Sequence, residues 1–120
     1  MKANLVRLAV DVTVNQGQLD AFKAIAKEMT SASEAEPETL GYEFFFSTDE
    51  KQCRLLETYE DANAVLAHFT GPVVGKLVPQ ITPLCTIDRF EIYGDPGPQV
   101  TQMAASLGAK FFSYWAGLSR

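Results

Sequence analysis

The sequence is poor in the residues that build metal centres and disulfide frameworks. Its 120 residues contain one histidine, His68, and two cysteines, Cys53 and Cys85, neither of which belongs to a CxxC motif. Two isolated cysteines are too few for a disulfide framework, and one histidine cannot build a zinc site of the usual kinds without cysteine or acidic residues at suitable spacing. We therefore expect no metal, and we interpret both cysteines as small buried strand residues.

Basic charge and long apolar runs are scarce as well. The net charge of −5 gives no electrostatic reason to expect nucleic acid or an anionic membrane as a partner. No stretch is long enough to span a bilayer, and a charge interrupts the apolar residues near the N-terminus, so we expect no signal peptide and a cytoplasmic location. The sequence also lacks GxGxxG, P-loop and Gly-x-Ser-x-Gly motifs.

What the sequence does contain is a regular succession of strand and helix patterns. Alternation or aromatic enrichment predicts strands at residues 5–14, 39–47, 52–59 and 84–93. Helical spacing begins at Gln18 and ends near Pro37. Asp61 is expected to cap a second helix that Gly71-Pro72 breaks, with one or two further turns over residues 73–78.

This order, β-α-β-β-α-β in about 90 residues, predicts a ferredoxin-like α+β fold with an antiparallel sheet and two helices on one face. Cys53 and Cys85 then lie on strands that are not neighbours. The strand at 39–47 has aromatic side chains on both faces, which indicates that something covers the second face of the sheet. We expect one domain over residues 1–96 and a C-terminal extension over 97–120 that packs on the same domain or on a partner subunit.

The extension has two parts. Residues 99–107 predict a short helix with Val100, Met103, Ala104 and Leu107 turned inward, closed by Gly108. The segment 111–115, Phe-Phe-Ser-Tyr-Trp, holds the only tryptophan. A segment this apolar is expected to dock on its own domain, on a partner subunit or across the mouth of a pocket.

Three segments resemble one protein family. The run Leu56-Glu57-Thr58-Tyr59-Glu60-Asp61, followed by Ala64, Leu66, Ala67 and His68, is similar to the antibiotic biosynthesis monooxygenase (ABM) family. Gly41-Tyr42-Glu43 is similar too, and Phe90-Glu91-Ile92-Tyr93-Gly94-Asp95-Pro96 resembles a subgroup described as quinol monooxygenases. The resemblance covers about residues 5–96 and implies a homodimer in which two ferredoxin-like sheets pair as an α+β barrel. It also implies oxidation of electron-rich phenols or quinols by O2 as co-substrate, with no metal, flavin or haem.

On that reading His68 is a candidate general base, because the phenolate is the species that gives an electron to O2 and a base near pKa 7 suits its formation. Asn63, or an arginine such as Arg7 or Arg89, is a candidate donor to the resulting anion. The residues predicted to contact the substrate are Tyr42, Phe44, Tyr59, Phe69, Arg89 and Trp115. Glu57 and Tyr59 share a strand face, which permits a carboxylate–phenol pair.

Structural interpretations stand beside these roles. His68 is also placed where a cation favours the C-terminal end of a helix, and Asn63 is an ordinary first-turn residue. For Glu57, a position on the sheet surface or in an interface is slightly favoured over one in a site. The aromatic residues 42–46 are core or interface first and pocket lining second.

The chain also departs from the family pattern. Ala67 stands where the aromatic-polyketide oxygenases carry a tryptophan, and we hypothesise that Trp115 fills this space beside His68. Val10 and His68 stand where haem-degrading relatives need asparagine and tryptophan, which disfavours haem degradation. Two alternative functions remain: a non-oxidative isomerase or binding protein for a small hydroxylated or phosphorylated metabolite, and a non-catalytic dimeric binding module.

Overall fold

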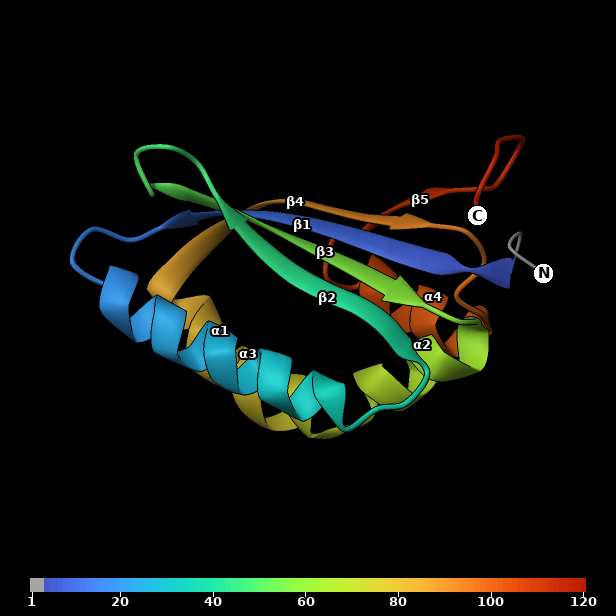
Figure 1. Cartoon of the computed structure of the whole chain (residues 1–120), viewed down its shortest axis with the longest axis horizontal. Helices are drawn as coiled ribbons and strands as arrows, with labels where there is room; N and C mark the ends of the chain where they lie inside the picture. Colours follow the sequence, from blue (N-terminus) through green and yellow to red (C-terminus); the bar gives the residue numbers. More distant parts are fainter. Residues whose placement is uncertain (1–3) are drawn as a thin grey trace.

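The computed structural model of the chain describes residues 4–120 and contains a five-stranded sheet in the order β2-β3-β1-β4-β5 (Figure 1). Its strands are β1 (Val6–Val14), β2 (Thr39–Phe46), β3 (Gln52–Tyr59), β4 (Cys85–Tyr93) and β5 (Lys110–Phe112). All neighbouring strands are antiparallel except β4 and β5. The first four strands therefore confirm the predicted ferredoxin-like fold, with β1 between β3 and β4.

The helices all lie on one face of this sheet (Figure 1). They are α1 (Leu19–Glu34), α2 (Ala62–Phe69), the π-helical turn η2 (Val73–Leu77), α3 (Val78–Ile81), the 3-10 turn η3 (Thr82–Leu84) and α4 (Pro98–Ala105). No helix within residues 4–120 is long and apolar enough to cross a bilayer.

Local chemistry explains how the elements begin and pack. The Asp61 side chain accepts a hydrogen bond from the amide of Ala64 at 2.9 Å, which confirms it as the cap of α2. On α1, the apolar stripe buries Phe22, Ala26 and Met29 against the sheet. Phe22 and Met29 of this stripe also line a cavity between the helices and the sheet.

The core is divided into two clusters. One lies under α2 and α4 and contains Val6, Leu8, Tyr59, Ala64, Val65, Phe69, Ile92, Val100 and Ala104. The other lies under α1 and η2 and contains Val14, Phe22, Ala26, Met29, Cys53, Val73, Leu77 and Ile81. Cys53 and Cys85 are free thiols, as expected for residues on β3 and β4, which β1 separates.

The C-terminal extension corrects one prediction and adds an element. Val100 and Ala104 are fully buried, but Leu107 is 65 % exposed and not part of the buried core, because α4 ends before it and Leu107 lies on the following turn. The sequence did not reveal β5, which pairs with the C-terminal end of β4 and stacks Phe112 on Tyr93 with ring centroids 5.2 Å apart. Beyond β5, Trp115 is 93 % exposed.

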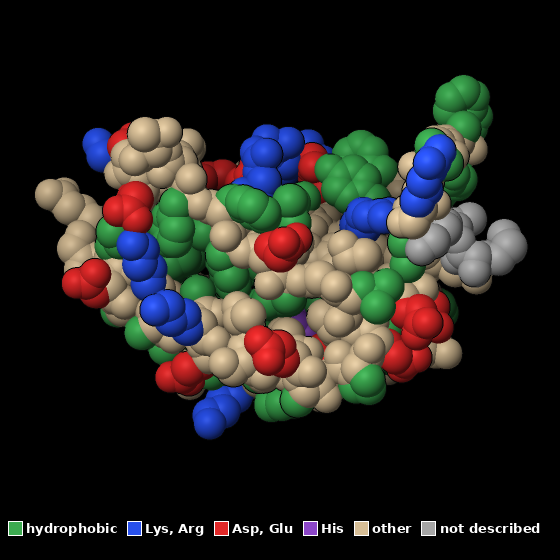
Figure 2. Space-filling model, viewed as in Figure 1, with side chains coloured by type: hydrophobic (Ala, Val, Ile, Leu, Met, Phe, Trp, Pro, Cys, Tyr) green, Lys and Arg blue, Asp and Glu red, His purple; other side chains and the backbone are tan. Residues whose placement is uncertain are grey.

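In the part of the chain that the structure describes, the second face of the sheet carries no helix. Its exposed apolar side chains include Phe45, at 51 %, and Leu56, at 38 %. Asp11 lies among them, with its carboxylate 2.6 Å from Arg54 Nε and 3.1 Å from Arg89 Nε. Figure 2 shows this mixture of hydrophobic and charged side chains along the upper edge of the molecule. That a partner subunit covers this face remains a prediction.

Candidate active site

His68 lies in the last turn of α2, where it is 2 % exposed. Its Nδ1 is 2.8 Å from Glu36 Oε1, and that same oxygen accepts a hydrogen bond from the Thr39 hydroxyl at 2.8 Å. Because a carboxylate can only accept hydrogen bonds, Nδ1 carries the hydrogen and donates the hydrogen bond to Glu36. In the neutral ring the other nitrogen, Nε2, then keeps a free lone pair, as in catalytic pairs where a carboxylate fixes the histidine tautomer.

Glu57 lies across from this nitrogen. Its Oε1 is 3.8 Å from His68 Nε2, and the same oxygen accepts a hydrogen bond from the Tyr59 hydroxyl. Burial raises the pKa of the Glu57 carboxyl, an effect that His68 and the Tyr59 hydroxyl partly offset. The carboxylate–phenol pair predicted on this strand is therefore present. The preferred interpretation of Glu57 as a sheet-surface or interface residue is wrong, since its side chain is only 6 % exposed.

Two tyrosines complete the polar end of the site. The ring centroids of Tyr42 and Tyr59 lie 5.5 and 5.3 Å from that of His68. Burial raises the pKa of both phenols above the ordinary value, so both remain protonated donors.

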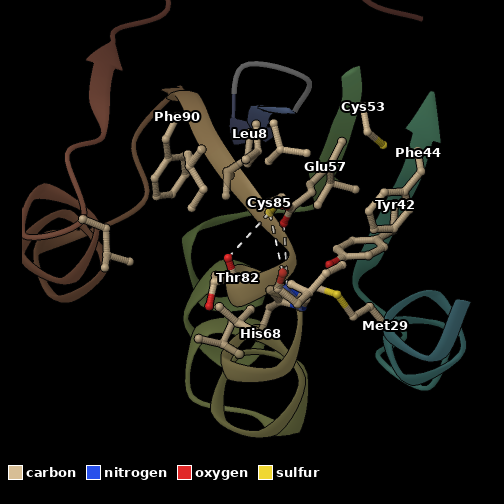
Figure 3. Close-up of a pocket in the computed structure, with 18 of the residues that line it drawn as sticks. Leu8, Met29, Tyr42, Phe44, Cys53, Glu57, His68, Thr82, Cys85 and Phe90 are labelled. Atoms are coloured by element: carbon tan, nitrogen blue, oxygen red, sulfur yellow. Dashed lines mark hydrogen bonds and ion pairs between the residues drawn. The ribbon is translucent and has the colours of Figure 1, made fainter. Parts of the chain in front are cut away.

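His68, Glu57 and Tyr42 form part of the wall of a cavity of about 220 Å³ between the sheet and the helices (Figure 3). Figure 3 shows Leu8 and Phe90 on the sheet side, with His68 and Thr82 on the helix side. The remaining wall is made by Val10, Val12, Phe22, Met29, Phe44, Cys53, Leu55, Phe69, Val74, Val78, Ile81, Cys85, Ile87 and Leu107. Among residues 4–120, no lysine or arginine lines this cavity. The site is thus an apolar chamber with an acid–base group at one place in its wall.

The structure separates the residues predicted for the site into two groups. His68, Tyr42, Phe44 and Phe69 line the cavity, and Tyr59 lies behind it through its bond to Glu57. The others do not line it: Asn63 is exposed on the first turn of α2, Arg89 binds Asp11 on the opposite face of the sheet, and Trp115 projects from the tail. Trp115 therefore does not fill the space beside His68 within its own protomer.

Glu36 is the residue that the sequence did not reveal. It lies between α1 and β2, directly before Pro37, and 32 positions along the chain from His68. Nothing in its local sequence distinguishes it from the other acidic residues near the end of α1. Only the packing of the α1–β2 connection against α2 brings the two side chains together.

A second cluster of acidic side chains lies outside this site. Carboxylate oxygens of Glu38, Glu60 and Asp61 lie within 4.8 Å of one another, which is close enough to share a cation. The group is outside the cavity, and Asp61 is already engaged as the cap of α2. Asp61 also raises the pKa of Glu38 by charge repulsion, as expected for neighbouring surface carboxylates.

The fold and the cavity define a ferredoxin-like α+β protein with a buried acid–base pair in the wall of an apolar cavity. The model of the family described as antibiotic biosynthesis monooxygenase matches residues 5–80. The chain therefore belongs to the antibiotic biosynthesis monooxygenase family. No curated protein shows significant similarity to it.

Solved structures support the fold over different lengths. The structure of MupZ from Pseudomonas fluorescens is 24 % identical, covers 98 % of this chain and 95 % of its own, and has a TM-score of 0.84. A Bacteroides thetaiotaomicron protein of unknown function, described as a possible oxidoreductase, is 26 % identical over 75 % of this chain and 96 % of its own, with a TM-score of 0.69. A Chloroflexus aurantiacus protein described as belonging to the same family is 21 % identical over 78 % and 95 %, with a TM-score of 0.64.

Proposed function

We propose that this protein is a cofactor-independent monooxygenase that oxidises a small, neutral phenol or quinol with O2. Family membership supports the general class of reaction. The observation that carries the substrate class is the cavity itself, which is apolar, free of lysine and arginine among residues 4–120, and reached by His68. Such a chamber suits a planar neutral ring and excludes water from the reaction.

The first step is removal of the phenolic proton by His68 Nε2, whose lone pair is free because Nδ1 donates to Glu36. The 3.8 Å between Nε2 and Glu57 Oε1 is too long for a hydrogen bond. One substrate oxygen placed beside that line lies within about 2.8 Å of both atoms. The substrate hydroxyl is proposed to bind there.

Glu57 takes the role of donor to the phenolate that the sequence suggested for Asn63 or an arginine. Because burial raises the pKa of Glu57, its neutral form is favoured and can donate a hydrogen bond to the developing anion. Tyr59 holds this carboxyl in place, and the Tyr42 phenol is a second donor at the same wall.

The oxidation then balances without any further reactant. The phenolate gives one electron to O2, and the resulting radical and superoxide join at a ring carbon that bears hydrogen. The peroxide takes up the proton held by His68. Loss of the ring hydrogen as a proton breaks the O–O bond, so one oxygen atom remains as the quinone carbonyl and the other leaves as water.

A homodimer belongs to this proposal. The outer face of the sheet exposes Phe45 and Leu56 beside arginine side chains and the acidic side chain of Asp11. A second copy of the same face can complement this combination of apolar surface and opposite charges. Sheet-to-sheet pairing would cover these apolar residues.

A second candidate is a non-oxidative isomerase, and the Glu36–His68–Glu57–Tyr59 chain favours it because a base and an acid already face one cavity. The absence of lysine and arginine from the wall, within residues 4–120, speaks against a phosphorylated substrate. Trp115 of the C-terminal tail is exposed and does not line the cavity, which disfavours a binding module whose cavity its own tail fills.

The test is oxygen consumption with a panel of phenols and hydroquinones, wild type against His68→Ala. The proposal predicts uptake with at least one compound, reduced about 10²–10⁴-fold by the substitution. No uptake with any member would reject the monooxygenase, whereas uptake that His68→Ala leaves unchanged would reject the role of His68 alone.

A further inference from the structure

The cavity opens to solvent at an apolar mouth. Among the lining residues within 4–120, only Ile87 and Leu107 are exposed, at 50 % and 65 %, and the others are buried or half-buried. A side chain that belongs both to the wall and to the surface marks the place where the two meet. Neither residue at this mouth carries a polar group.

Ile87 is directed into the cavity by an irregularity in the sheet. The register between β1 and β4 shifts between Asp11, which pairs with Arg89, and Val12, which pairs with Ile87. The extra residue on β4 allows both Ile87 and Phe90, three positions apart, to line the same cavity. Because β5 pairs with residues 91–93, the edge of β4 beside Ile87 carries no further strand from residues 4–120.

Leu107 is held at the other side by a closed turn rather than by a loose segment. Its amide donates to the carbonyl of Ala104 at 3.0 Å, and the amide of Ala109 donates to the same carbonyl at 3.0 Å. Gly108 between them has a φ of +85°, a conformation that favours glycine and ends the helix. These hydrogen bonds and Gly108 therefore hold the backbone of Leu107 in a defined turn.

Polarity changes along the cavity from one end to the other. His68 and Glu57, the charged or titratable pair, are 2 % and 6 % exposed and lie away from solvent, whereas the mouth is purely aliphatic. Apolar cavities of roughly 150 Å³ accept a benzene ring. A cavity of about 220 Å³ therefore holds a ring and the start of a substituent, and a longer substituent must leave through the mouth.

We propose that the substrate is amphipathic: a phenolic head binds at His68 and Glu57, and an apolar alkyl chain leaves the cavity between Ile87 and Leu107. The chain covers these two side chains and removes their surface from water. This inference rests on the proposed function for the identity of the head group, but the chain subsite is tested by binding alone.

The test is calorimetric titration, without oxygen, of phenol and of 4-alkylphenols from ethyl to hexyl. Each methylene buried at the mouth is expected to lower Kd about fourfold, which corresponds to about 0.8 kcal/mol per buried CH2. A Kd that does not change with chain length would overturn the proposal.

Substitution at the mouth localises the effect. Leu107→Glu is expected to weaken hexylphenol about tenfold and to leave phenol unchanged, because the carboxylate must be desolvated only when a chain passes it. The matched control is Leu118→Glu, since Leu118 is 78 % exposed and does not line the cavity. Equal weakening of hexylphenol by both variants, or equal weakening of phenol and hexylphenol by Leu107→Glu, would contradict the subsite.

The same experiment separates the two proposals. Chain-length-dependent binding with no oxygen uptake in the activity assay rejects the monooxygenase and supports the amphipathic ligand. Oxygen uptake with short phenols and no gain in affinity from longer chains does the reverse.

Discussion

Glu57→Gln is the substitution that tests the proposed site most sharply. Glutamine keeps the shape of the side chain, an oxygen that can accept from the Tyr59 hydroxyl, and an NH2 group that can donate to the substrate anion. If Glu57 works as a neutral donor, kcat/KM of this variant at neutral pH stays within about tenfold of wild type. Glu57→Leu removes the donor and is expected to lower kcat/KM by about 10²–10³.

The pH dependence of these variants differs in a defined direction. In wild type a protonated Glu57 is required, and burial raises its pKa, so the activity falls as pH rises through the folded-state pKa of Glu57. In Glu57→Gln this requirement is gone, and the activity does not show this fall. The measurement is kcat/KM of both proteins across the pH range in which both are folded.

The loss of a buried contact usually lowers stability, but at high pH Glu57→Gln is expected to raise it. Because the folded-state pKa of Glu57 is raised, its stabilising contribution is complete below the unfolded pKa of about 4.3 and is lost as pH rises through the folded value. A protonated His68 at 3.8 Å attracts an ionised Glu57 by only about 4 kcal/mol at an effective dielectric constant of about 20. Desolvation costs several kcal/mol for each buried ion, so it outweighs this attraction.

We therefore expect Glu57→Gln and wild type to have similar Tm values at pH 4 and the variant to have the higher Tm at pH 8. Thermal unfolding followed by circular dichroism measures both. A variant that is less stable than wild type at pH 8, or one whose activity keeps the descending limb, would refute the assignment of Glu57 as a neutral donor.

Three further predictions follow from other parts of the structure. Glu36→Gln is expected to lower kcat about tenfold with little change in KM, because the variant holds the His68 tautomer less firmly. The control Glu38→Gln, at an exposed neighbouring residue, is expected to change neither constant. Steady-state kinetics measures both variants, and equal effects would contradict the positioning role of Glu36. Burial raises the pKa of the Cys53 thiol to about 11, so about one molecule in a thousand carries the thiolate at pH 8. Iodoacetamide labelling of Cys53, measured by mass spectrometry, should therefore be slow in the folded protein and fast after unfolding. Rapid labelling of the folded protein would contradict the burial of Cys53. Phe45→Glu on the outer sheet face is expected to convert the proposed homodimer to monomer in sedimentation experiments, and an unchanged mass would place the interface elsewhere.

The fold was predictable because its signals are local. Alternation in residues 5–14, the Asp61 cap and the break at Gly71-Pro72 each act over a few neighbouring residues, and each appears in the structure as expected. The strand β5 was not predictable, because three residues become a strand only through pairing with the free edge of β4. Leu107 fits a helical stripe in sequence but falls after the end of α4.

The site was only partly predictable, because some of its residues meet through local sequence patterns and others only through tertiary packing. His68 and the Glu57–Tyr59 pair lie close together in sequence, so the strand and helix periods place them near one another. Glu36 reaches His68 through tertiary packing that no local pattern encodes. Arg89 and Phe90 are adjacent in β4 but lie on opposite faces, so only the register decides that Phe90 and not Arg89 faces the cavity.

The most direct test of the proposed oxidation is the fate of oxygen-18 supplied as O2. A phenol or hydroquinone that the protein converts should yield a quinone containing one atom of oxygen-18, with the second atom recovered in water and one O2 consumed for each product. His68→Ala should form this labelled product about 10²–10⁴-fold more slowly. A product formed at the wild-type rate without oxygen-18 would contradict the monooxygenase.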